Sequence, residues 1–469
     1  MIRNGFFLFI IILIPITISE ISAQQNNTES VVALSLSQCI EITLKHSPIK
    51  KISSLAVRAA EARIKQARSG TYPKIDATAG YFLMDQDPNF LFPEMSVEIP
   101  PINMGTFSIS PGAFTVPSQN IKLADKQSLS ASIEFLFPLY TGGKISSYIS
   151  QAEAALEIAK SESRENDEQI IFETSKLYYA SLLATKLEEI AGEAYDRLNS
   201  TLKLTDAAYK NGSGSVTRSD YLKNKTVAEA VKSILIQISG ERKNALAALA
   251  HSMGLDWKTQ IKISDKEFPR LEGTKDLETL INSAVRQNPL FDKVDSGLKV
   301  FESKIELAKS SLYPSVALFG NYRKIFNNYD YGMMSAENKN IWMVGVGLQL
   351  NIFEGLRTSG MIDEAKADYE RLNAQKELLT KGISMKVQYL YNKLQTAKEK
   401  ESASKEAMQS AAEDRELVEK AYFSDIMELK DLIQAQITES IMKAQYETSL
   451  YEWALLDAEL RLVLAENNN

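Results

Sequence analysis

The chain has 469 residues, of which 44% are hydrophobic and 24% are charged, and its formal net charge is −7. This composition suits a large folded chain, and the lack of a basic excess argues against nucleic acid as a partner. With one cysteine and two histidines, the chain has no internal disulfide or thiolate metal cluster, and we expect no catalytic residue, metal or cofactor, and no enzyme.

The first 23 residues have the pattern of a secretory signal peptide. Arg3 gives a positive start, residues 6–14 are apolar, and residues 21–23 (Ile-Ser-Ala) form a small-residue cleavage site. The alternative is a membrane anchor, which needs about 20 apolar residues, and Pro15 cuts the run short. We therefore predict that residues 1–23 are a signal peptide and that the chain is exported.

Residues 144–209 contain no proline and a single glycine and predict one uninterrupted helix. At 1.5 Å per residue it is roughly 100 Å long. Its apolar residues recur at steps of three and four, so it needs long partner helices. A return helix is predicted over 219–253, which is too short to cover the long helix. Shorter helices are predicted over 47–69 and 289–312, and one of them stacked on the end of a return helix nearly matches the length of the long helix. The long helix taken by itself is equally compatible with a cytoplasmic coiled-coil rod.

A sequence repeat organises the chain. Two dipeptide landmarks recur 241 positions later, and a turn motif recurs 213 positions later. The matched pairs are Ser47-Pro48 with Asn288-Pro289, Tyr72-Pro73 with Tyr313-Pro314, and residues 141–144 (Thr-Gly-Gly-Lys) with 354–357 (Glu-Gly-Leu-Arg). Constant offsets at several landmarks indicate a duplication.

The change in offset locates an insertion in the first half, the proline-rich segment 85–125, which we interpret as a large loop. The domain boundaries that follow are residues 24–254 for the first repeat and 281–469 for the second. A connector over residues 255–280 is expected beside the middle of the helices.

Each repeat contains two runs in which apolar residues alternate with small or polar ones. They lie near residues 75–81 and 127–139 in the first repeat and 316–322 and 342–350 in the second. Such strands fit a membrane barrel wall, and the aromatic residues at their ends fit its interfaces. The predicted lumen face includes Ser128, Ser130, Ser132, Glu134 and Gln349. The alternative is a pair of soluble hairpins packed on the helices.

Four strands cannot close a membrane barrel, because the smallest such barrels have eight. Open strand edges in lipid would leave backbone groups unpaired at a cost of several kcal/mol each. If the strands lie in a membrane, several copies of the chain must therefore pool them.

The combination of a repeat, paired strands and long helices resembles the TolC-type outer-membrane channels of bacterial efflux and type I secretion. The resemblance covers essentially the whole mature chain. Its carriers are the duplicated helices, the Tyr-Pro helix ends, and the strand ends at residues 138–144 and 351–357. It implies a mainly α fold with a β membrane part, in which a homotrimer forms a twelve-stranded barrel in outer-membrane lipid and a long periplasmic tunnel of helices.

The resemblance also implies functional places at the two helical turns. Its turn pattern appears as Tyr209, Gly212 and residues 220–222 (Asp-Tyr-Leu); the second copy keeps Tyr422 but has Asp425 where glycine is usual. The turn residues are expected to contact an adaptor protein, although they are equally compatible with plain hairpin turns. They are Gly212, Ser213, Gly214 and Ser215 in the first turn and Ser424, Asp425, Ile426 and Met427 in the second.

The family closes its periplasmic end with acidic residues just inside the second turn. Asp431 matches the first of them, whereas Gln434 stands where a second acid is usual. One acid from each of three chains makes a like-charge ring that can bind cations. The alternative is an aspartate that only suits the start of a helix.

Two function classes follow. The leading one is a passive exit duct in the bacterial outer membrane, fed by an inner-membrane transporter of the RND or ABC type through a periplasmic adaptor (membrane fusion) protein. The alternative is a secreted coiled-coil scaffold or adhesin. The alternating strands favour the duct, because a scaffold has no need of strand pairs with one apolar and one polar face.

Overall fold

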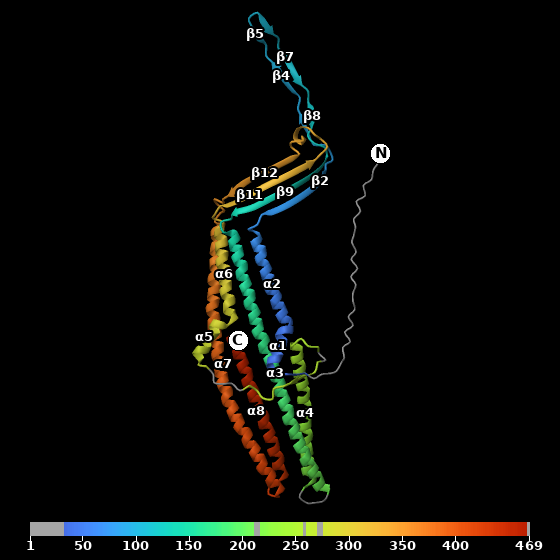
Figure 1. The fold of residues 1–469 in the computed structure, drawn as a ribbon, viewed down its shortest axis with the longest axis vertical. Coiled ribbons are helices and arrows are strands. Elements are labelled where there is room, and N and C mark those ends of the chain that lie inside the picture. Colours follow the sequence, from blue (N-terminus) through green and yellow to red (C-terminus); the bar gives the residue numbers. More distant parts are fainter. Residues whose placement is uncertain (1–31, 211–215, 257–258, 270–274, 467–469) are drawn as a thin grey trace, which may run out of the picture.

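The computed structural model describes residues 32–210, 216–256, 259–269 and 275–466. The predicted signal peptide and the first turn, residues 212–215, lie outside them. The molecule is elongated: long helices fill one end, a small sheet crosses the middle of the upper half, and a β-hairpin projects at the far end (Figure 1). Within the described residues, no helix is both long enough and apolar enough to span a membrane.

The same order of six elements occurs twice. The first series is α1 (Leu36–His46), α2 (Pro48–Ser69), β2 (Lys74–Leu83), β9 (Gln127–Tyr140), α3 (Lys144–Lys210) and α4 (Arg218–Ser252). The second is α5 (Leu277–Gln287), α6 (Pro289–Ser310), β11 (Ser315–Phe326), β12 (Asn340–Gln349), α7 (Arg357–Phe423) and α8 (Leu429–Leu464). Matched helices are equal in length within one residue, and α3 and α7 both have 67 residues.

The helix starts explain the first landmark pair. Ser47 and Asn288 are N-caps whose side-chain oxygens accept hydrogen bonds from the second backbone N–H beyond them, at 3.2 and 3.0 Å. Pro48 and Pro289 occupy the first helical position, where a missing N–H costs nothing. The expected stacking is confirmed: α2 lies along the upper half of α3 and α4 along its lower half (Figure 1).

The four expected strands form one antiparallel sheet in the order β12-β11-β9-β2. Its register brings most of the apolar residues onto one face, as in the aligned set Ile133, Tyr322 and Trp342, whereas Phe319, Leu136, Met343 and Ile341 fall on the other. The opposite face carries serine, threonine and charged side chains. Because β12 and β2 are the outer strands of this order, each has one edge without a partner in the sheet.

The glycine motif joins the sheet to the long helices. Gly142 and Gly143 have φ of +62° and +90°, and Gly355 and Leu356 repeat the pattern with +59° and +66°. A side chain at Gly142 would meet Ser310 O and Tyr313 Cβ at 2.7 Å. The first motif therefore requires glycine for space as well as for conformation.

The interpretation of residues 85–125 as a loop is wrong. The segment is a long hairpin of three antiparallel ladders (Figure 1). The strands are β3 (Asn89–Phe92), β4 (Met95–Ile99), β5 (Ile102–Met104), β6 (Phe107–Ile109), β7 (Gly112–Val116) and β8 (Gln119–Lys122). All six prolines fall outside these strands, where no ladder N–H is needed, so they divide the hairpin without preventing it.

A hydrophobic core holds the middle of the helices. Here β1 (Val32–Leu34) pairs in parallel with β10 (Ile261–Ile263), so the segment before α1 is tied to the connector. Tyr178 in α3 donates a hydrogen bond to Asp265 at 2.7 Å, and Phe268 packs against Tyr179. Cys39 is fully buried in this core, and burial, aided by the nearby Asp265 charge, raises the pKa of its thiol to about 11.

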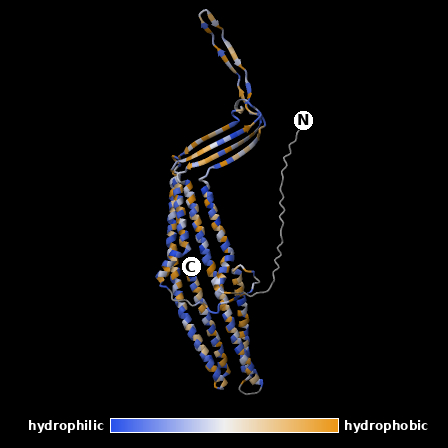
Figure 2. Cartoon of the chain, viewed as in Figure 1, coloured by the Kyte–Doolittle hydropathy of each residue, from blue (hydrophilic) through white to orange (hydrophobic). Residues whose placement is uncertain are grey.

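Hydrophobic and hydrophilic residues are interleaved along all the helices (Figure 2). Even so, small cores follow α7 and α8, from Leu390 and Leu464 near the middle to Val418 and Leu432 near the turn. The hairpins are therefore held along their length, and the turn residues sit at the end of a packed pair of helices.

Candidate functional site

The turn between α7 and α8 keeps a regular shape despite its aspartate. Asp425 has φ +54°, the left-handed conformation that glycine usually supplies. Ile426 N–H donates to Ala421 O at 2.9 Å and Asp425 N–H to Tyr422 O at 3.1 Å, which is the hydrogen-bond pattern of a Schellman motif. Aspartate tolerates this conformation better than most residues. The aspartate at position 425 is therefore compatible with an intact helix end.

The predicted tip residues of the second turn, Ser424 to Met427, lie together at the end of the molecule. The side chain of Ile426 is 77% exposed and that of Phe423, the last residue of α7, is 64% exposed. Ser424 donates from Oγ to Lys420 O. The tip thus presents apolar side chains on a fixed turn. In the first hairpin only the flanks of the predicted tip are described, where Tyr209 and Tyr221 stack with ring centroids 6.2 Å apart.

Asp431 lies in the first turn of α8, where its carboxylate accepts a hydrogen bond from Glu428 N–H at 3.3 Å. Asp220 holds the equivalent place in α4, accepting from Thr217 N–H at 3.2 Å and Thr217 Oγ1 at 2.7 Å. These bonds from Thr217 lower the pKa of Asp220. Within one chain, both aspartates act as helix-start residues. The expected aperture, formed by Asp431 with the exposed Gln434 one turn further on, stays a prediction.

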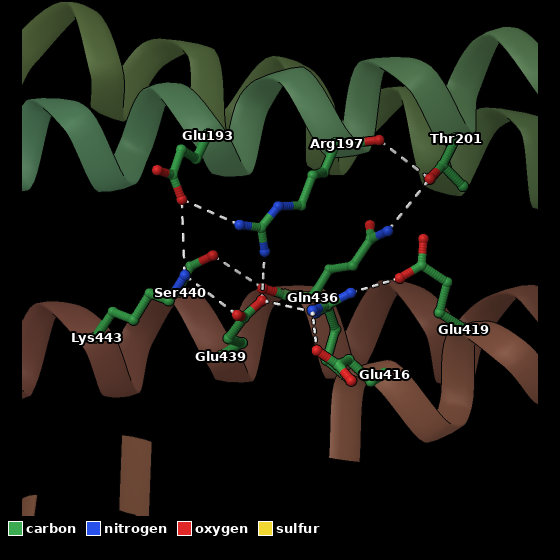
Figure 3. Close-up of polar contacts among 10 residues, drawn as sticks. Glu193, Arg197, Thr201, Glu416, Glu419, Gln436, Glu439, Ser440 and Lys443 are labelled. Carbon is green, nitrogen blue, oxygen red and sulfur yellow. Dashed lines mark hydrogen bonds and ion pairs between the residues drawn. The ribbon is translucent and has the colours of Figure 1, made fainter. Parts of the chain in front are cut away.

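A buried carboxylate joins the two hairpins about two turns beyond Asp431. Glu439 in α8 is 2% exposed and forms ion pairs with Arg197 of α3, Arg415 of α7 and Lys443 of α8 (Figure 3). The Arg415 and Lys443 nitrogens lie 3.0 and 3.2 Å from its oxygens. Because its partners come from three helices, Glu439 fixes the second hairpin against α3.

Further polar groups surround this cluster. Glu193 contacts Arg197 at 3.0 Å and Lys443 at 3.6 Å, and Glu419 contacts Arg415 from the surface. Gln436, also buried, donates from Nε2 to Thr201 Oγ1 at 3.4 Å. Figure 3 shows these side chains converging from α3 on one side and from α7 and α8 on the other.

Sequence reasoning missed Glu439, although a signal was present. The buried stripe of α8 runs through Leu432, Ala435, Gln436 and Glu439 at steps of one, three or four residues. A glutamate in an otherwise apolar or amide stripe is seldom buried without a partner. Its two arginine partners lie on other helices and have no fixed sequence separation, and only Lys443, four residues further along α8, is a local partner. The stripe could therefore flag the residue but not the cluster.

The residues predicted to face the lumen share one face of the sheet. Ser132 Oγ lies 2.7 Å from Thr78 Oγ1, and Glu134 is paired in register with Asp76 and Asn321. The register also places Gln349 on this face, together with Ser128 and Ser130. The register therefore places the five residues on one face of the sheet, as the alternation predicted. That this face lines a lumen stays a prediction.

Among the described residues, no group of three or more histidine, cysteine, aspartate or glutamate side chains is arranged to hold a metal ion. The charged clusters that are present are mixed in sign. These clusters form ion pairs between side chains of opposite charge, which stabilise the packing of the helices.

Comparison with known proteins agrees with this architecture. Residues 40–255 and 280–468 match the model of a family described as outer membrane efflux protein. The chain is 21% identical over 387 residues to protein CyaE of Bordetella pertussis, covering 79% of this chain and 71% of that protein. It is 23% identical over 341 residues to outer membrane protein TolC of Vibrio cholerae, covering 71% and 76%.

The fold is also found among solved structures. A membrane protein from Pseudomonas aeruginosa superposes with a TM-score of 0.73 at 17% identity, over 92% of this chain and 91% of that one. The likeness covers helices and sheet together, so the whole architecture is shared.

Proposed function

Because the chain belongs to the outer membrane efflux protein family, we propose that three copies form one channel that is the exit duct of a tripartite efflux or type I secretion system. The protein is an outer-membrane channel with a helical periplasmic extension, and members of this family are passive conduits rather than enzymes. In the proposal, substrate enters at the helical tips and leaves past the sheet.

The observation that carries the proposal is the sheet with two open edges. Strands β12 and β2 each lack one neighbour, and the apolar face carries exposed side chains in the single chain, with Val344 and Val346 at 66% and 63% exposure. In lipid, unpaired edge groups cost several kcal/mol each. Joining β12 of one copy to β2 of the next satisfies every edge, and three copies give twelve strands with the apolar face outward and the Glu134 face inward.

The polar face supports a water-filled interior. Asp76, Glu134, Asn321 and Arg323 lie on adjacent strands of this face by register. Charged side chains at this density are tolerated where they meet water, as in the lumen of a porin. The proposed duct therefore has a hydrated passage continuous with the inside of the helical tunnel.

The helical tips support a partner in the periplasm. The second turn combines exposed Phe423, Ile426 and Met427 with a fixed backbone, which suits a docking surface for an adaptor protein. The adaptor would in turn connect the duct to an inner-membrane transporter of the RND or ABC type.

Planar-bilayer recording tests the duct directly. Purified protein added to one side should insert and give uniform, ohmic conductance steps, and these should be reduced by a purified cognate adaptor added to the tip side. Insertion without any conductance, in protein whose mass is that of a trimer, would contradict a duct and favour a scaffold.

A further inference from the structure

The hairpin that projects beyond the sheet, residues 89–122, is here called the arm. It continues the β2–β9 hairpin and exists only in the first repeat, since β11 and β12 are joined by a short connection, residues 327–339. Figure 1 shows it reaching away from the helices, past the end of the sheet. In the proposed orientation this is the cell exterior.

Two ladders of the arm, β4–β7 and β5–β6, have one apolar face each, and in the β3–β8 ladder Phe90, Phe92 and Ile121 share a face while Leu91 lies on the other. In the β4–β7 ladder, Val97 pairs with Phe114 on one side, whereas Ser96 with Thr115 and Glu98 with Ala113 lie on the other. In the β5–β6 ladder, Ile102 pairs with Ile109 and Met104 with Phe107, with Asn103 and Ser108 opposite. The exposed apolar side chains on these faces, at 37% or more, are Phe90, Phe92, Met95, Val97, Ile99, Ile102, Met104, Phe107, Ile109, Phe114 and Ile121.

The prolines keep this pattern in step on both strands. On the outgoing strand the apolar positions jump by three residues from Phe92 to Met95 and from Ile99 to Ile102. On the returning strand the paired positions also jump by three, at Ser110-Pro111 and at Pro117-Ser118. A random proline-rich loop has no reason to match its breaks across two strands. The matched breaks keep apolar residues paired across every ladder, namely Phe90 with Ile121, Val97 with Phe114, and Ile102 with Ile109.

The base of the arm is held firmly. Lys122 forms ion pairs with Asp87 at 2.8 Å and Asp125 at 2.5 Å, and these contacts raise the pKa of Lys122. Asn327 of the second repeat donates to the carbonyls of Asp125 and Gln127 at 3.1 and 2.9 Å. The direction of the arm relative to the sheet is therefore set by polar contacts to both repeats.

The arm beyond this base lacks the support that a β-ribbon needs. A two-stranded ribbon is marginally stable alone in water, and an apolar face needs cover. We propose that the apolar faces of the three arms pack against one another above the mouth of the channel, forming a six-stranded stalk of three copies of this segment. This proposal rests on the proposed threefold channel.

The charge of the arm favours packing between copies over packing on lipid or on a transient protein partner. Residues 89–121 contain only two charges, Glu94 and Glu98, and no lysine or arginine. A hairpin that lies on lipid typically carries basic side chains on its polar face, and a transient protein partner is usually steered by charge. An apolar, nearly uncharged face is characteristic of a permanent interface. In the proposed trimer, the arms of the other two chains are always present beside each arm.

Single cysteines near the arm tip test the stalk. Wild type is the blank, because its only cysteine, Cys39, is fully buried. Met104→Cys and Phe107→Cys place a thiol on the apolar face, and Asn103→Cys and Ser108→Cys are matched controls one residue away on the polar face. Under mild oxidation of intact channel, we expect disulfide-linked dimers from at least one of the apolar pair and from neither control.

Two readouts separate this proposal from the proposed function. The mass of each sample is measured in detergent, so a monomer would count against the threefold channel itself. Trimer that gives no cross-link with either apolar cysteine, or equal cross-linking with the polar controls, would overturn the stalk alone. Cross-linking is repeated in lipid nanodiscs, and apolar cysteines that react with maleimide in detergent but are shielded without cross-linking in nanodiscs would assign the face to lipid instead.

Discussion

At the scale of single residues, the two glycine motifs show how one duplicated turn has diverged. Both place two successive residues at positive φ, but Leu356 occupies the place that Gly143 has in the first repeat. A non-glycine residue in this conformation costs of the order of 1–2 kcal/mol. The packing also differs, because a side chain added at Gly355 meets nothing within 4 Å, unlike one at Gly142.

This difference gives a paired prediction. Gly142→Ala should lower the free energy of unfolding by about 1–2 kcal/mol for conformation and about 1–3 kcal/mol more for the contacts with Ser310 and Tyr313. Gly355→Ala, with φ +59° and open space, should lose only the first part. Thermal unfolding in detergent compares them, and equal losses would show that the close contact at Gly142 relaxes without cost.

Asp431 is the residue on which the proposed aperture depends. If three copies converge at the tip, their carboxylates form a narrow anionic ring that favours cations. Asp431→Asn should then weaken cation selectivity and block by a trivalent cation added from the tip side, measured on single channels. Asparagine keeps an oxygen that can cap the helix, so the change removes charge with little loss of structure.

Two further variants sharpen this measurement. Asp220→Asn removes the equivalent helix-start charge in the first hairpin and should leave selectivity unchanged, whereas Gln434→Glu adds a second ring and should strengthen block. If Asp431→Asn behaves like Asp220→Asn, then Asp431 serves only the start of α8.

At the scale of elements, the long hairpins are tied together by a few buried polar contacts. Glu439, itself 2% exposed, forms ion pairs with cations from α3, α7 and α8 whose side chains are 18–31% exposed. Removing its charge leaves those cations without their shared counterion. The alignment of the second hairpin against α3 should therefore depend on Glu439 more than on surface ion pairs.

Glu439→Gln should destabilise the protein by roughly 1.5–3 kcal/mol, the range for hydrogen bonds to charged groups. The matched control is Glu419→Gln, which removes a more exposed partner of the same Arg415 and should cost about 0–1 kcal/mol. The two are compared by denaturant unfolding in detergent. A neutral effect at Glu439 would mean that water or Glu193 replaces it.

The sheet offers a second prediction at this scale. Val346 lies on the apolar face opposite Leu318, and Asn321 lies three residues further along β11 on the polar face, beside Glu134. Val346→Arg should impair assembly by about 2–4 kcal/mol, whereas Asn321→Arg should be tolerated. The yield of assembled trimer is measured for both variants. Equal yields would show that the apolar face does not contact lipid as assigned.

Most elements could be predicted from the sequence because each has a local signal. The 67-residue helices lack breakers, the strands alternate, and the caps Ser47 and Asn288 stand directly before proline. The arm was missed because its prolines interrupt the alternation after a few residues, and only cross-strand pairing restores it. The pairing of β1 with β10 and of Glu439 with Arg197 and Arg415 depends on distant segments and leaves no local pattern.

At the scale of the whole molecule, the single chain is visibly incomplete. Its helices expose apolar residues such as Leu378 and Met385, its sheet has two free edges, and its arm has an apolar face without cover. In the proposed trimer, we expect a threefold axis along the length of the molecule to cover these surfaces. The family relationship and these uncovered surfaces together support the proposed trimeric duct.

The most direct test of the trimer is the mass of the protein particle in detergent. Light scattering corrected for bound detergent, on wild-type protein extracted from outer membranes, should give three times the mass of one processed chain at all dilutions that keep the protein folded. A folded particle with the mass of a single chain would contradict the trimeric channel, because four strands alone cannot close a channel wall.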